Sequence, residues 1–155
     1  MRKTLLKFLT AVLGFNMVSS CFYLYASPHA DFEAKGRVSD GDGNPVPGIM
    51  VDLANKFYND QSGELTYEPM DNEKTATSSD GSFYVRATDY LAMPDSVTVL
   101  FTDVDGESNG GEFLPKEVTV PVVKVSDGDG AWDVGVYSVP DDMNVILEKA
   151  PEVKK

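Results

Sequence analysis

Short runs of alternating apolar and polar residues, separated by turn-forming residues, fill the sequence from position 32 to position 150. Segments 82–87 and 97–104 are the clearest, because they are rich in β-branched and aromatic residues. Helical periodicity is hardly visible. In a chain of 155 residues this pattern predicts one all-β domain, a Greek-key β-sandwich of seven to eight short strands.

Turn-forming residues mark where the strands end. The Asp80-Gly81 pair between two strand-like runs is a strong hairpin signal. Pro121 lies within the strand-like segment 118–125 and has no N–H group to donate to a neighbouring strand, so an edge strand or a bulge is expected there. Segment 55–72 is polar with scattered aromatic residues and is predicted to be an irregular excursion or an extra hairpin.

The apolar positions of these runs give a predicted core. Its members share an inward position in the alternation, with Trp132 as a further candidate: Val38, Val51, Leu53, Phe83, Val85, Val97, Val99, Phe101, Val120, Val122 and Ile146.

The amino-terminal segment predicts export and lipidation. Residues 1–20 combine basic residues, an apolar run over 8–15 and the small residues Ser19 and Ser20, which is typical of a signal peptide. The ending Val18-Ser19-Ser20-Cys21 resembles the lipobox of bacterial lipoproteins, which implies that Cys21 carries a diacylglycerol and becomes the first mature residue. The alternatives are an ordinary signal peptide with a chance cysteine, or a free buried thiol. We therefore divide the chain into a lipoprotein signal peptide (1–20), a lipidated tether (21–31), a β-sandwich (32–150) and a tail (151–155).

The charge limits the partners. The net charge is -12, and removing Arg2, Lys3 and Lys7 leaves 10 basic against 25 acidic residues, a mature charge of -15. Nucleic-acid binding through phosphate neutralisation is therefore excluded. One cysteine and one histidine also exclude a disulfide framework, a zinc cluster and a Cys-His nucleophile pair. The expected location is the bacterial cell envelope, on a membrane through the lipid, with the periplasmic face of the outer membrane preferred.

Three segments carry a family resemblance: 35–40 (KGRVSD), 43–51 (GNPVPGIMV) and 77–85 (TSSDGSFYV). They resemble the G-x-V, G-x-P-x-P-G-x-x-V and T-x-x-D-G-x-F signature of carboxypeptidase regulatory-like domains. The resemblance implies a transthyretin-like sandwich, and it covers the first half of the domain through about residue 87. In this motif the glycine at 81 permits a tight turn and Phe83 enters the core.

The whole chain also resembles a narrower group, lipoproteins of Bacteroides-type bacteria described as associated with radical S-adenosylmethionine (radical SAM) enzymes. The residues that carry this resemblance are Cys21, segment 25–32 (YASPHADF), Lys35-Gly36 and segment 102–106 (TDVDG). It implies a neighbouring radical SAM enzyme in the genome, which is a candidate partner, and it brings no catalytic residues.

The acidic loop after segment 97–104 is the candidate metal site. Its carboxylates, Asp103, Asp105, Glu107 and Glu112, alternate on a glycine-rich loop that is able to wrap a calcium ion. The alternative is that Asp and Gly simply make turns. A glycan-binding face is a further candidate, against the alternative of core packing. It would be formed by Trp132 and five tyrosines: Tyr58, Tyr67, Tyr84, Tyr90 and Tyr137.

These observations favour a lipid-anchored envelope protein that acts as a non-catalytic binding, scaffold or accessory module. We name no catalytic residue and expect no cofactor, calcium being the exception weighed above. The partner is an envelope protein or a glycan. The alternatives are a substrate that the radical SAM enzyme modifies, and a calcium-dependent adhesin or glycan-binding module.

Overall fold

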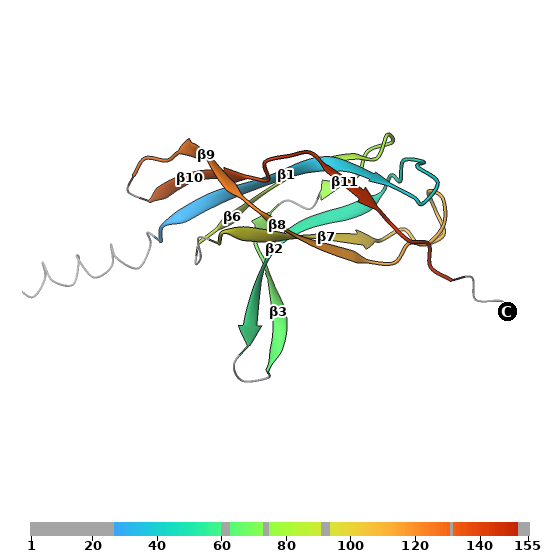
Figure 1. Ribbon diagram of the computed structural model, residues 1–155, viewed down its shortest axis with the longest axis horizontal. Helices are drawn as coiled ribbons and strands as arrows, with labels where there is room; N and C mark the ends of the chain where they lie inside the picture. The colour runs from blue at the N-terminus through green and yellow to red at the C-terminus, as the bar shows by residue number, and fades with distance from the viewer. Residues whose placement is uncertain (1–26, 60–62, 73–74, 91–93, 131, 152–155) are drawn as a thin grey trace, which may run out of the picture.

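The computed structural model describes residues 27–59, 63–72, 75–90, 94–130 and 132–151. These residues contain no helix and form two sheets that lie face to face, so the predicted all-β sandwich is confirmed (Figure 1). Eleven strands occur in the described ranges: β1 (His29–Ser39), β2 (Ile49–Asn59), β3 (Glu64–Pro69), β4 (Asp71–Asn72), β5 (Thr75–Ala76), β6 (Ser82–Asp89), β7 (Ser96–Asp103), β8 (Lys116–Pro121), β9 (Val123–Asp127), β10 (Asp133–Ser138) and β11 (Met143–Ile146). The number of strands is higher than the seven to eight predicted. Segment 55–72 adds β3 and β4, and the count includes β4 and β5, which have only two residues each.

The first sheet is built around β1. Its strand order is β4-β6-β1-β10-β9, with β11 also paired to β1. Strand β6 runs antiparallel along one edge of β1. On the other edge β10 pairs in parallel with the first half of β1, and β11 pairs in parallel with the second half. The sheet is therefore mixed, and β1 is bonded on both sides along its length.

The second sheet is antiparallel and has the order β3-β2-β7-β8, with β5 paired to β2. The first half of β2 pairs with β7, and its second half continues as a hairpin with β3. Figure 1 shows this hairpin leaving the sandwich as an arm. Segment 55–72 thus contains the extra hairpin, and β2 runs to Asn59 instead of ending near residue 53.

Side chains at the base of the arm contact the outer face of the second sheet. Adjacent strands lie about 4.8 Å apart, so β3 and β8 would be about 14 Å apart in a flat sheet. Yet the Tyr67 hydroxyl on β3 donates a hydrogen bond to the Glu117 carboxylate on β8. Lys56 Nζ lies 3.5 Å from the same carboxylate and 5.2 Å from the centre of the Tyr67 ring. These contacts hold the base of the arm against the sheet.

The core lies between the two sheets and contains most of the predicted residues. Eight of them are at most 6% exposed: Val38, Val51, Leu53, Phe83, Val85, Val97, Val99 and Phe101. Val120 and Val122 are partly buried against this core. The Phe83 and Phe101 rings meet edge to face at 5.5 Å between centroids, which joins the two sheets.

Two core predictions are wrong. Ile146 is 54% exposed, because β11 pairs with β1 in a register that sets Val145 opposite the inward-facing Val38. Neighbouring residues of a strand point to opposite faces, so Val145 and Leu147 are buried instead. Trp132 is 44% exposed, because it precedes β10 in a loop at the end of the sheet.

The three segments that resemble the carboxypeptidase regulatory-like signature meet at one corner. The Val46 N–H donates to the Val38 carbonyl, and the Val38 N–H donates to the Gly81 carbonyl. Gly81 has a φ of 76°, and a Cβ at this position would lie 2.3 Å from the Val38 oxygen. This position therefore requires glycine. Thr77 completes the corner, since its hydroxyl donates to the Val46 carbonyl at 2.7 Å and accepts from the Ile49 N–H at 3.0 Å.

The chain changes sheets after β8. Pro121 ends β8 at one edge of the second sheet, and Val123 begins β9 at the edge of the first sheet. The edge position expected around this proline is confirmed.

Candidate functional site

The predicted lipidation residue, Cys21, lies outside the described residues, as do the signal peptide and most of the tether. Strand β1 begins at His29, three residues before the predicted start of the sandwich. The end of the molecule where β1 starts is therefore the end nearest to Cys21 along the chain.

The acidic loop after β7 is organised by Asp103. Its Oδ1 accepts hydrogen bonds from the N–H groups of Asp105 and Gly106, and its Oδ2 accepts one from Phe113 N–H at 2.8 Å. The carboxylate thus satisfies backbone donors of its own loop, which is how aspartates stabilise turns. These bonds favour the turn alternative for Asp103.

The other three candidate calcium ligands do not gather around Asp103. The Asp105 carboxylate accepts a hydrogen bond from the Asn109 amide, and Glu107 and Glu112 are exposed. In the part of the chain that the structure describes, no three His, Cys, Asp or Glu side chains come together as a metal site. Calcium binding by this loop stays a prediction.

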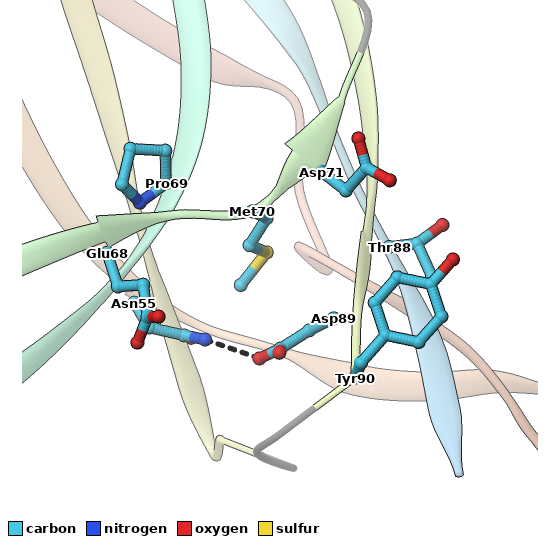
Figure 2. Close-up of a pocket in the computed structure, with 8 residues that line it drawn as sticks. All are labelled: Asn55, Glu68, Pro69, Met70, Asp71, Thr88, Asp89 and Tyr90. Carbon is cyan, nitrogen blue, oxygen red and sulfur yellow. Dashed lines mark hydrogen bonds between the residues drawn. The ribbon is translucent and has the colours of Figure 1, made fainter. Parts of the chain in front are cut away.

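A pocket of about 170 Å³ lies where β2, β3, β4 and β6 converge, at the edge of the sandwich. Figure 2 shows the side chains that surround it. They come from both sheets and include three carboxylates: Asn55, Glu68, Pro69, Met70, Asp71, Thr88, Asp89 and Tyr90. None of these residues was singled out as a site by the sequence, except Tyr90 as one of the aromatic residues.

The chain makes this pocket by crossing from one sheet to the other. Strand β3 ends at Pro69 in the second sheet, and β4 begins at Asp71 in the first sheet, paired with Thr88 of β6. Met70 lies between them, 6% exposed, with its N–H bonded to the Leu53 carbonyl at 3.0 Å. The crossing therefore leaves Met70 as an apolar wall among polar side chains.

Two polar residues end the core at this pocket. Asn55 lies two residues after the buried Leu53 of β2, and Asp89 lies two residues after the buried Ala87 of β6, so both occupy inward positions. The Asn55 amide nitrogen donates to the Asp89 carboxylate, as Figure 2 shows. Asp89 is only 7% exposed. The pair forms the inner wall of the pocket.

The carbonyl oxygen of Asn55 is an unsatisfied acceptor. The atom is buried, and no donor among the described residues bonds to it. A buried polar atom without a partner costs about 1–3 kcal/mol. A ligand that donates a hydrogen bond to this oxygen would therefore recover that free energy.

A second polar cluster lies beside the pocket on the outer face of the first sheet. The Thr88 hydroxyl donates to Asp31 Oδ1 at 2.6 Å, and the Arg86 guanidinium lies 2.6 Å from Asp31 Oδ2 and 3.3 Å from Glu33. Burial raises the pKa of Asp31, but the bonds from Thr88 and Arg86 outweigh it, so the pKa lies below the usual value for aspartate. The positive charge of Arg86 is thus balanced by the carboxylates of Asp31 and Glu33.

The aromatic residues considered for a glycan-binding face differ in exposure. Tyr90 at the pocket is 49% exposed, and its ring contacts the His29 ring at 5.7 Å between centroids. Tyr84 and Trp132 are also exposed, whereas Tyr137 stacks on the buried Phe32 ring at 5.4 Å. The side chain of Tyr58 lies outside the described residues.

A second hollow, of about 230 Å³, lies between the segment before β8 and the segment after β11. It is lined by Leu114, Pro115, Lys116 and Glu148, and the Lys116 ammonium already donates to the Ile146 carbonyl at 2.8 Å. This hollow lacks the buried polar pair of the first pocket. The first pocket is therefore the candidate functional site.

The first pocket presents several polar groups to a ligand. Its lining offers acceptor oxygens and an exposed ring over an apolar wall, which is the composition of a recognition site.

Within the described ranges no helix is long and apolar enough to cross a membrane. No family model and no curated protein matches the chain.

Proposed function

We propose that the protein is a lipid-anchored component of the bacterial cell envelope that acts as a non-catalytic binding, scaffold or accessory module. The lipid is attached to Cys21. Because β1 begins at His29, eight residues later, the connection spans at most about 29 Å. The sandwich is thus held close to its membrane, and the periplasmic face of the outer membrane is the preferred side.

The observation that supports a binding role is the pocket with the Asn55–Asp89 pair. Taking a carboxylate out of water costs free energy, yet Asp89 as a residue is only 7% exposed at the wall of an open pocket. Polar groups held in this way are typical of recognition sites. The non-catalytic part of the proposal rests on the sequence, whose single cysteine and single histidine leave few ways to build a nucleophile with its base.

The accessory role is supported by the resemblance to carboxypeptidase regulatory-like domains. The three segments of that signature are hydrogen-bonded to one another at the corner around Gly81, as a shared structural motif requires. On this proposal the sandwich is transthyretin-like and serves a partner in the envelope. The partner suggested by the second resemblance is a radical SAM enzyme.

The intact mass of the protein, extracted from the membranes of its native host, tests the anchor. We expect a chain that begins at Cys21 and carries two or three acyl chains. At about 0.8 kcal/mol per buried methylene, this is enough for stable attachment. The Cys21→Ser variant should lose the acyl groups and leave the membrane fraction, whereas Ser27→Ala, a matched change outside the lipobox, should not.

An unacylated Cys21 in a soluble protein would overturn the proposal. A further mass excess on another residue would instead favour the alternative in which the radical SAM enzyme modifies this protein.

A further inference from the structure

We propose that the pocket between β2, β3, β4 and β6 binds an organic ammonium cation, either a free amine or the end of a lysine side chain. This inference rests on the proposed binding role and names the ligand class. It is carried by four properties of the pocket, taken in turn: the unsatisfied acceptor, the scarcity of donors, the charge and the apolar wall.

The first property is the unsatisfied Asn55 oxygen. This oxygen is buried, lies on a residue that lines the pocket, and receives no hydrogen bond from the described residues. The amide nitrogen of the same side chain is directed at Asp89, which fixes the orientation of the amide. The missing partner of this oxygen must therefore be a donor.

The second property is that the lining side chains are mostly acceptors. The carboxylate oxygens of Glu68, Asp71 and Asp89 are hydrogen-bond acceptors. The Thr88 hydroxyl already donates to Asp31, which leaves the Tyr90 hydroxyl as the other side-chain hydroxyl donor among the described lining residues. An ammonium group has three donors and no acceptor, so it complements such a lining. A neutral sugar, whose hydroxyl oxygens also need donors, would find few.

The third property is charge. Three carboxylates line the pocket, and the described lining residues include no lysine or arginine. The nearby Arg86 is paired with Asp31 and Glu33, so it offsets little of this negative charge. Partly buried charges are less screened by salt than exposed ones, and the mature chain is strongly acidic. A cation is therefore attracted, and an anionic ligand is repelled.

A bare metal ion fits less well than an organic cation. Calcium requires six to eight oxygens at about 2.3–2.6 Å, and the acidic side chains described here do not converge as a metal site. They surround a cavity of about 170 Å³ instead. This space suits a cation with a carbon chain.

The fourth property is the wall that such a chain would contact. The thioether of Met70 is polarisable and adapts to methylene groups. The Tyr90 ring is about half exposed, and an aromatic face attracts a cation within about 6 Å of its centre. The pocket thus offers carboxylates and the Asn55 oxygen to the ammonium head, and Met70 and Tyr90 to the carbon chain.

The test is a ligand-observed NMR titration of the acylated protein in non-ionic detergent. The probes are n-butylammonium, neutral 1-butanol and tetramethylammonium, a cation without N–H donors. We expect n-butylammonium to bind with a dissociation constant of about 0.1–10 mM, since so small a ligand has few atoms with which to gain affinity. 1-Butanol should bind at least tenfold more weakly, and tetramethylammonium should lie between the two.

Two further probes distinguish the sources of the ammonium group. 1,5-Diaminopentane represents a free amine, and Nα-acetyl-lysine amide represents a lysine side chain of a partner protein. Tighter binding of the first assigns the pocket to a free amine, and tighter binding of the second assigns it to a lysine side chain; both support the proposal.

Variants locate the binding. Asp89→Asn, nearly equal in shape to the natural side chain, should weaken n-butylammonium binding about tenfold or more, because it removes a charged acceptor. Glu68→Gln, on an exposed residue, should weaken binding severalfold without affecting folding. The matched control is Glu112→Gln, which removes one charge near Asp103. Asp103 pairs with Ile49, about 20 Å along β2 from Asn55, so this control should leave binding unchanged.

The proposal fails if 1-butanol binds as tightly as n-butylammonium, or if Glu112→Gln weakens binding as much as Glu68→Gln does. Failure here, with Cys21 acylated, refutes the ligand class and leaves the anchor standing. An unacylated Cys21 with intact ammonium binding does the reverse.

Discussion

Replacing Gly36 by alanine should separate β1 from β11. A Cβ on Gly36 would lie 2.1 Å from the Met143 carbonyl oxygen and 2.8 Å from the carbonyl carbon of the same residue. Real Cβ contacts are essentially never below 3.0 Å, so β11 would have to move by about 1 Å. Its hydrogen bonds to β1, normally about 2.9 Å long, would then become too long to hold.

The size of the effect follows from what moves with β11. The strand pairs with β1 at four residue pairs and contributes the buried Met143 and Val145 to the core. Overpacking alone costs about 1–3 kcal/mol, and each weakened hydrogen bond adds about 1 kcal/mol. We therefore expect the free energy of unfolding to fall by about 3–5 kcal/mol. This is a large part of the total stability of a typical domain.

The measurement is urea denaturation followed by circular dichroism, in a Cys21→Ser background that carries no acyl chains. Gly41→Ala is the matched control, because a Cβ on Gly41 meets nothing within 4 Å. That control should be neutral or should stabilise the protein by about 0.4–1 kcal/mol, through a less flexible unfolded chain. If the two variants have the same stability, the close approach of β1 and β11 does not limit residue 36, and our reasoning is refuted.

Three more predictions test other contacts. Gly81→Ala should destabilise the protein by more than about 2 kcal/mol, because of the positive φ and the approach to the Val38 oxygen; thermal denaturation checks this, and a melting temperature like that of the wild type would contradict it. The pKa of Asp31 is lowered in the folded state, so its contribution to stability is present above the unfolded value of about 3.9 and is lost as the pH falls through the lower folded value. Asp31→Asn should therefore flatten the pH dependence of unfolding below pH 4, and equal slopes for variant and wild type would refute this sign. Tyr67→Phe removes the hydrogen bond to Glu117 at the base of the arm, so hydrogen exchange of the β2–β3 amides should become faster, while the β1–β6 amides serve as the internal control.

Alternation predicts the fold because one face of each strand is buried. In β6 and β7 every second residue is apolar, and Phe83, Val85, Val97 and Val99 all lie in the core as predicted. Alternation does not predict which residues of the last strand face the core. Val145, Ile146 and Leu147 are consecutive apolar residues, and each of them is suited to either face. Only the pairing of β11 with β1 decides between them.

The pocket was not predictable in this way. Asn55 and Asp89 are polar residues that read as solvent-exposed strand ends, and they become neighbours only because β2 and β6 face each other across the core. Segment 55–72 shows no regular alternation, so the crossing at Met70 that builds the pocket wall has no local signal. The sequence did contain one indication of the pocket. The inward positions of β2 and β6 are apolar as far as Leu53 and Ala87, and the next inward residue of each strand is polar.

The parallel pairing of β1 with β11 means that the first strand of the chain can complete its pairing only after the last strand is available. Gly36 and Met143 are partners in the sheet although they stand over 100 positions apart in the chain. Contacts between such distant positions carry a large loop-closure entropy and form slowly. The edge of β1 that faces β10 and β11 therefore stays unpaired over its second half until residues 143–146 reach it, and during synthesis the first sheet cannot close early. The sandwich therefore closes only once β11 has arrived.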